Sequence, residues 1–193
     1  MYYVSLQLLR ALLVFPLLAV GISAVADSEN PPPANKLEGY DSYTLQTTTM
    51  DAGIGKKKNA DKILKRIIAN LEEQVKPVLD EWNTAAVSLE NPEKLSIEPR
   101  IMSLHKPSAA NRVFAGSFAG GSRIVMRVRI VESESGKVIA EPEFYQHANA
   151  VGAAWSFGAT DNAMLDRVTQ MIAVYLKRNY LTPIGGVTGF EQE

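Results

Sequence analysis

One stretch near the middle of the chain constrains the fold more than any other. From Arg123 to Val131, apolar residues occupy every second position, and three arginines and two valines occupy the positions on the other face. This period of two is typical of a β-strand with one buried face and one exposed face. The expected buried face carries Ile124, Met126, Val128 and Ile130, and the opposite face carries Arg123, Arg127 and Arg129.

The residues after this strand predict a hairpin in a defined register. Glu134-Ser135-Gly136 fits a three-residue loop, with Gly136 in the left-handed conformation. The returning strand then runs over Lys137 to His147. This register sorts apolar residues to one side and opposite charges to the other. It pairs Arg129 with Glu141, Arg127 with Glu143, Ile130 with Ala140, and Met126 with Phe144.

Sequence patterns typical of α-helices occur both before and after the hairpin. A first apolar stripe runs from Ile63 to Trp82 after a cap at Asn59 or Asp61, and Pro77 should kink or split that helix. A last helix starts at Thr160 or Asp161 and carries a second stripe. The remaining strands are expected at Tyr43–Thr49 and at Leu95–His105, where Pro99 favours an edge position or a bulge.

These elements follow the order β-α-β-β-β-α and predict an α+β fold. We expect a single antiparallel or mixed sheet of about four strands, with two helices packed on one face. The domain should span residues 41–181, after a proline-rich spacer at 27–40 and before a flexible tail at 182–193.

The first 26 residues have the pattern of a signal peptide. Arg10 precedes an apolar run, and Ala24-Val25-Ala26 fits a cleavage site that leaves Asp27 first. The alternative is an uncleaved anchor, although the apolar stretch of 16 residues from Ala11 to Ala26 is shorter than the ~20 of a span. We therefore expect an exported protein of the periplasm or cell envelope, with no transmembrane span after cleavage.

Composition excludes several classes of protein and site. Without cysteine, the chain has no disulfide, no lipobox, no thiolate metal site and no cysteine nucleophile. A net charge of −1 gives no indication of a basic surface that binds nucleic acid. No cofactor motif is present, and none is expected.

The C-terminal half resembles a known family. The segments GSFAGGSRIVMRVRIVESESGKVIAEPEFYQ and FGATDNAMLDRVTQMIAVYLKRNY are similar to the bacterial domain of unknown function 4410 family. The resemblance implies a small envelope protein, often a lipoprotein, although the missing cysteine removes the lipid anchor here. It implies no functional residue, because the family has no settled activity.

Two parts of the sequence could form a catalytic, metal-binding or phosphate-binding site, but the sequence pattern of each is weak. His105 and His147 lie near strand ends and could meet with Ser103 or a carboxylate, yet no short ligand spacing accompanies them. The stretch from Gly53 to Lys58 could attract a phosphate, but it lacks the Walker spacing. We interpret the histidines and this loop as ordinary surface features, and predict no catalytic or metal site.

Six residues form the candidate partner or ligand surface: Arg123, Arg127, Arg129, Tyr145, Trp155 and Phe157. Cross-strand pairing with Glu141 and Glu143 would neutralise most of the arginine charge. Burial against the core would likewise account for the aromatic residues.

The leading hypothesis is a non-enzymatic envelope protein that binds a protein partner of unknown identity, with a free strand edge near Pro142 suited to docking. The alternative is a small-ligand or glycan-binding module that uses the loops at 116–122 and 148–158. A hydrolase built on Ser103, His105 and His147 is less favoured. The oligomeric state stays open.

Overall fold

The computed structural model describes residues 29–57, 59–86, 93–105, 121–148 and 159–190. Its centre is a mixed sheet in which two long strands, β4 (Lys94–His105) and β5 (Arg123–Glu132), run antiparallel. Two short strands extend it on each side, so the sheet has six strands rather than the expected four. They are β2 (Ser42–Leu45) and β3 (Thr49–Met50), both parallel to β4, and β6 (Val138–Ala140) and β7 (Glu143–His147), both antiparallel to β5.

Proline interrupts both outer strand pairs at the same level of the sheet. Pro99 lies opposite Val128, between the residues of β4 that pair with β2 and those that pair with β3. On the other side, the Val128 N–H donates to the carbonyl of Pro142, which separates β6 from β7 (3.0 Å). A proline has no N–H for a ladder, so it suits such a gap. Pro99 therefore lies in a central strand and not at an edge, and a bulge follows it between Ile101 and Ser103.

The predicted hairpin register is confirmed from Met126 to Ile130, and it shifts by one residue next to the turn, where Val131 pairs with Val138. Ile130 pairs with Ala140, Met126 with Phe144, and Arg127 with Glu143. Gly136 adopts a φ of +70°, the left-handed conformation expected of it.

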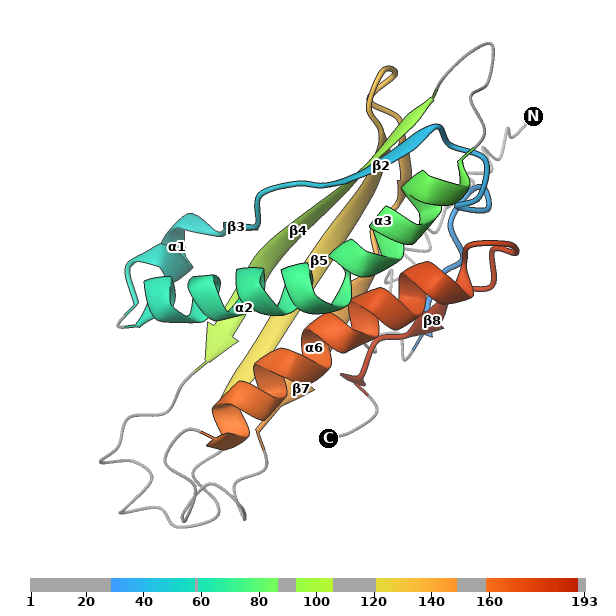
Figure 1. The fold of residues 1–193 in the computed structure, drawn as a ribbon. Coiled ribbons are helices and arrows are strands. Elements are labelled where there is room, and N and C mark those ends of the chain that lie inside the picture. Colours follow the sequence, from blue (N-terminus) through green and yellow to red (C-terminus); the bar gives the residue numbers. More distant parts are fainter. Residues whose placement is uncertain (1–28, 58, 87–92, 106–120, 149–158, 191–193) are drawn as a thin grey trace, which may run out of the picture.

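Helices cover one face of the sheet (Figure 1). The expected first helix is split at Val75, two residues before Pro77, into α2 (Ala60–Gln74) and α3 (Lys76–Ala85). With the last helix, α6 (Ala159–Arg178), three helices replace the expected two, and the loop before α2 contains the short α1 (Ala52–Gly55). The apolar stripes of α2, α3 and α6 meet the inner residues of β4 and β5 in one core, which includes Ile67, Leu79, Ile97, Met126, Phe144 and Ile172.

Both sheet edges are closed by an asparagine side chain. At β2, Asn83 accepts from the Tyr43 N–H (2.7 Å) and donates to the Tyr43 carbonyl (3.0 Å). At β7, Asn30 accepts from the Glu143 N–H (2.7 Å) and donates to the Glu143 carbonyl (2.8 Å). Each amide thus makes the two bonds that a neighbouring strand would make.

The segments expected as spacer and tail pack against the domain. Asn30 belongs to β1 (Glu29–Asn30), which pairs antiparallel with β8 (Gly186–Val187). Leu37 is completely buried, and the Thr188 carbonyl accepts from the N–H of Tyr145 on β7 (2.8 Å). The expected domain limits at residues 40 and 182 therefore do not coincide with a break in packing.

Among the helices that the structure describes, none combines the length and the hydropathy that a membrane crossing requires.

Candidate functional site

Arg127 and Arg129 on the exposed sheet face are paired with carboxylates, as the hairpin register predicted. Arg127 donates to Glu143 (2.9 Å from Nε), and this hydrogen bond raises the pKa of Arg127. Arg129 contacts both Glu141 (2.9 Å) and Glu98 of β4 (2.8 Å). This face is therefore a ladder of opposite charges and offers little unpaired positive charge to an acidic partner.

The other surface candidates are dispersed. Arg123 begins β5 and is exposed, whereas Tyr145 is buried and stacks on Phe190 with ring centroids 4.8 Å apart. Trp155 and Phe157 lie outside the described residues. The candidate residues that the structure describes therefore do not form an exposed aromatic cluster.

The two histidines do not meet. His105 and His147 each lie opposite Arg123, on the strands to either side of it. Two strand spacings separate their backbones by about 10 Å, with the arginine between them. Within the described residues, no group of three histidine, aspartate or glutamate side chains could hold a metal ion.

The strand edge near Pro142 is not free. The Asn30 side chain occupies the backbone groups of Glu143, Thr188 occupies the N–H of Tyr145, and the Ala34 N–H donates to the Ile139 carbonyl of β6 (2.9 Å). The expectation of an open docking edge is wrong at these positions, because residues far away in sequence cover it.

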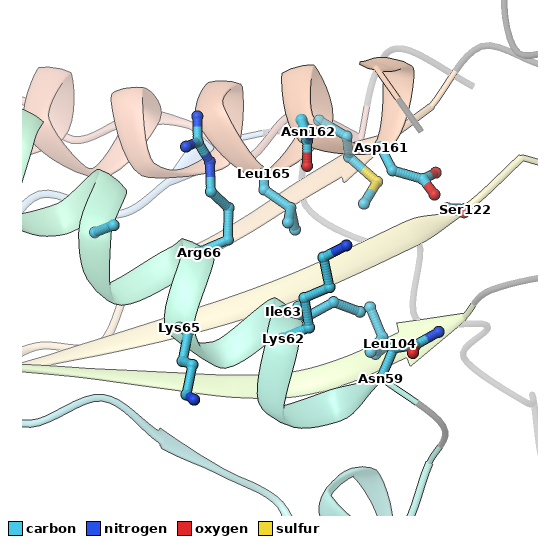
Figure 2. Close-up of a pocket in the computed structure, with 12 residues that line it drawn as sticks. Asn59, Lys62, Ile63, Lys65, Arg66, Leu104, Ser122, Asp161, Asn162 and Leu165 are labelled. Atoms are coloured by element: carbon cyan, nitrogen blue, oxygen red, sulfur yellow. The ribbon is translucent and has the colours of Figure 1, made fainter. Parts of the chain in front are cut away.

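A pocket of about 550 Å³ lies between the N-terminal halves of α2 and α6, at the end of the sheet where β4 finishes and β5 begins (Figure 2). Its volume is within the ~300–1,000 Å³ range of small-molecule sites. The floor is apolar and includes Ile63, Leu104, Met164 and Leu165. The polar lining consists of Asn59, Lys62, Lys65, Arg66, Ser122, Asp161 and Asn162.

Lys62 and Arg66 give the pocket its charge. They lie one helical turn apart on α2 and extend toward α6, whereas Lys65 points away from it (Figure 2). None of the three forms an ion pair with a residue that the structure describes. Across the pocket lie Asp161 and Asn162, in the first turn of α6, where the helix dipole is positive.

The glycine–lysine segment adjoins this region and contains the short helix α1. Ile54 of α1 is buried in the core, and the Lys57 ammonium donates to the Leu104 carbonyl at the end of β4. The described part of this segment therefore contributes a core side chain and one strand-end contact, and the expectation of a solvated loop is wrong at Ile54.

Sequence reasoning missed the pocket because its polar residues occur on the solvent side of an amphipathic helix. Charges there usually only solvate the helix. A signal was nevertheless available: Lys62 and Arg66 are like charges at i and i+4, an arrangement that costs an isolated helix about 0.2–0.5 kcal/mol. Asn162 offered no such signal, because its place opposite α2 depends on tertiary packing.

Comparison with solved structures finds only distant likeness. A PelC dodecamer from Paraburkholderia phytofirmans aligns with 74% of this chain and 92% of its own, at 8% identity and a TM-score of 0.40. Protein XCC0632 from Xanthomonas campestris aligns over 76% and 86%, at 12% identity and a TM-score of 0.37. Protein CT253 from Chlamydia trachomatis aligns over 74% and 98%, at 11% identity and a TM-score of 0.39.

These similarities are too low to carry function or assembly over to this chain. The search of curated proteins gives no match. The sequence model of one family does match, over residues 31–152, which include the sheet, α2 and α3. The chain therefore belongs to the family known as domain of unknown function 4410 (DUF4410), as its sequence resemblance indicated.

Proposed function

We propose that this protein is a non-enzymatic binding protein of the cell envelope, and that the pocket between α2 and α6 holds a small anionic ligand. The observation that carries the proposal is the pair Lys62 and Arg66, two cations without ion-pair partners among the described residues, at the mouth of a pocket with an apolar floor. The envelope location rests on the N-terminal sequence pattern.

The lining favours an anionic sugar among small ligands. A phosphate or carboxylate between Lys62 and Arg66 would relieve their mutual repulsion and accept charge-assisted hydrogen bonds. The apolar floor suits the C–H face of a pyranose ring, and the amides of Asn59 and Asn162 can bond its hydroxyl groups. This arrangement supports the small-ligand or glycan-binding alternative more than the docking of a protein on the sheet face.

Calorimetric titration tests this function with glucose 6-phosphate and glucuronate as anionic probes and glucose as the neutral probe. We expect binding of at least one anionic probe, weakening as salt rises, and none of glucose. Lys62→Gln and Arg66→Gln should each reduce the affinity by about tenfold or more, because each removes a charged hydrogen-bond donor.

Lys177→Gln is the matched control, since Lys177 is an exposed cation in the last turn of α6, at the other end of that helix from the pocket. It should leave the affinity unchanged. An equal loss for Lys177→Gln would show that general surface charge is responsible, and the absence of binding by either anionic probe would refute the pocket proposal.

A further inference from the structure

A second surface feature lies at the other end of α6. Of the five exposed large hydrophobic residues in the described chain, four occur between the end of this helix and β8: Val174 (53% exposed), Leu181 (65%), Ile184 (52%) and Val187 (49%). We call these four side chains the apolar patch. A shallow groove of about 150 Å³ runs between α6 and β8 and is lined by Val174, Val187 and Arg178.

The apolar patch is presented by ordered backbone. The buried Asn179 side chain accepts from the N–H groups of Ile184 and Gly185 (both 2.8 Å) and donates to the Gly185 carbonyl (3.1 Å). Gly185 has a φ of +76° and lies so close to Asn30 that an added Cβ would be 2.3 Å from its carbonyl oxygen. The turn is therefore fixed to both α6 and β1, and its apolar side chains are held outward.

The N-terminal part of the chain enters at the same place. Glu29 of β1 pairs directly with Val187, so residues 1–28 join the domain beside the apolar patch. Those residues contain the apolar stretch from Ala11 to Ala26, whose pattern is that of a membrane-targeting segment. A membrane that holds this stretch while it is still attached to the chain would lie next to the apolar patch.

Charge and size also favour a bilayer over a second protein. Lys177 and Arg178 are exposed in the last turn of α6, beside the apolar patch, and Glu29, an acidic residue, pairs with Val187 of the patch. Aliphatic side chains flanked by cations suit the boundary between acyl chains and anionic headgroups. Four side chains supply far less than the ~800 Å² per partner of a stable protein interface.

From these observations we infer that the apolar patch docks on the surface of a bilayer that carries anionic lipid, with Lys177 and Arg178 at the headgroups. This surface is distinct from the proposed ligand pocket. The rise of the helix places Asp161 and Arg178 about 25 Å apart along α6. A docked domain would thus keep the pocket away from the membrane.

The absence of native cysteine makes a direct test simple. Single substitutions Ile184→Cys, Val187→Cys and Val138→Cys can each carry an environment-sensitive fluorophore on the full chain. Val138 is the matched control, because it is the fifth exposed large hydrophobic residue (39%) and lies on β6, outside the apolar patch. The labelled proteins are mixed with phosphatidylglycerol vesicles or with phosphatidylcholine vesicles.

We expect a blue shift and quenching by spin-labelled lipid at positions 184 and 187 on phosphatidylglycerol vesicles, and neither effect at position 138. A smaller response on phosphatidylcholine is expected because the cations then lose their headgroup partners. No response at 184 and 187, or an equal response at 138, would overturn the inference. A response that rises with protein concentration without vesicles would instead identify a second copy as the occupant.

The pocket variants separate this inference from the proposed function. Lys62→Gln and Arg66→Gln should leave the fluorescence response at position 187 intact while they weaken ligand binding. Loss of the fluorescence response in those variants would mean that basic charge elsewhere drives the vesicle contact, and the assignment to the apolar patch would be wrong.

Discussion

At the scale of single residues, two asparagines act as substitutes for strands. Asn83 and Asn30 each bond both backbone groups of one edge residue, Tyr43 on β2 and Glu143 on β7. An amide presents one donor and one acceptor in the same plane, as a peptide group does. An exposed edge invites pairing with other chains, so these side chains protect the sheet from aggregation.

Asn30→Asp tests this role with almost no change in shape. The carboxylate cannot donate to the Glu143 carbonyl, so we expect the free energy of unfolding to fall by about 1–3 kcal/mol. Urea denaturation measures the change. Asn162→Asp, exposed in the first turn of α6, is the control and should stay within about 0.5 kcal/mol of the parent. Equal stability of the two variants would contradict the assignment.

At this scale, sequence could predict only the local partners. The pairs Arg127–Glu143 and Arg129–Glu141 follow from one turn and a period of two, because their members are 16 and 12 residues apart. Asn30 and Glu143 are 113 residues apart. No periodicity connects them, so the contact depends on a fold that must already be known.

At the scale of elements, the C-terminal segment packs against the domain despite its composition: β8 pairs with β1 in a separate two-stranded sheet, and the Thr188 carbonyl accepts from the Tyr145 N–H of β7. Its glycines suggested flexibility, but Gly185 and Gly189 have positive φ values and approach neighbouring backbone closely. An added Cβ at Gly189 would lie 2.4 Å from the carbonyl oxygen of Tyr145. Glycine here permits close packing of the segment against β7, which composition alone does not distinguish from disorder.

Gly189→Ala should therefore destabilise the domain by about 2–4 kcal/mol, since it combines a backbone clash with an unfavourable φ of +84°. Thermal unfolding followed by circular dichroism measures the effect. Gly53→Ala is the matched control, because an added Cβ there meets nothing within 4 Å and φ is not positive. If Gly189→Ala unfolds at the temperature of Gly53→Ala, the segment does not pack as described.

At the scale of the whole molecule, tyrosine hydroxyls attach the N-terminal segment to the core. Tyr175 donates to the Pro31 carbonyl (3.0 Å) and Tyr43 to the Leu37 carbonyl (2.9 Å). Burial raises the pKa of each of these tyrosines to about 12, and desolvation likewise raises that of Tyr40 to about 12. The folded state therefore holds these phenols in the neutral form.

This predicts sensitivity to alkali. A folded-state pKa above the unfolded value of ~10 contributes stability that is complete below pH ~10 and is lost as pH rises toward 12. Amide hydrogen exchange is too fast at alkaline pH to report on stability. The test is therefore the urea concentration at the midpoint of unfolding, measured at pH 8, 10 and 11.5. The midpoint should fall sharply only above pH 10. Tyr175→Phe should reduce this dependence, and an unchanged pH profile in that variant would exclude Tyr175 as a cause.

The whole fold was predictable in outline because its core obeys local patterns. The alternation in β5, the turn at Gly136 and the helix break before Pro77 each predict a structure that is observed. The parallel pairing of β2 and β3 with β4 was not predictable in detail, since parallel strands carry no turn signal. The pocket was missed for a related reason: α2 and α6 are brought together only by tertiary packing.

The pairing of β1 with β8 also affects when the fold can be completed during synthesis of the chain. The chain is synthesised from its N-terminus, so Glu29 and Asn30 emerge long before Gly186 and Val187 exist. At ~5–20 residues per second, the stretch from His147 to Phe190 takes roughly 2–9 seconds to make. Throughout that interval β7 lacks the Thr188 carbonyl that completes it. A chain that folds during synthesis would therefore stay partly assembled until its last residues appear, and a chaperone would have its greatest effect on it in those seconds.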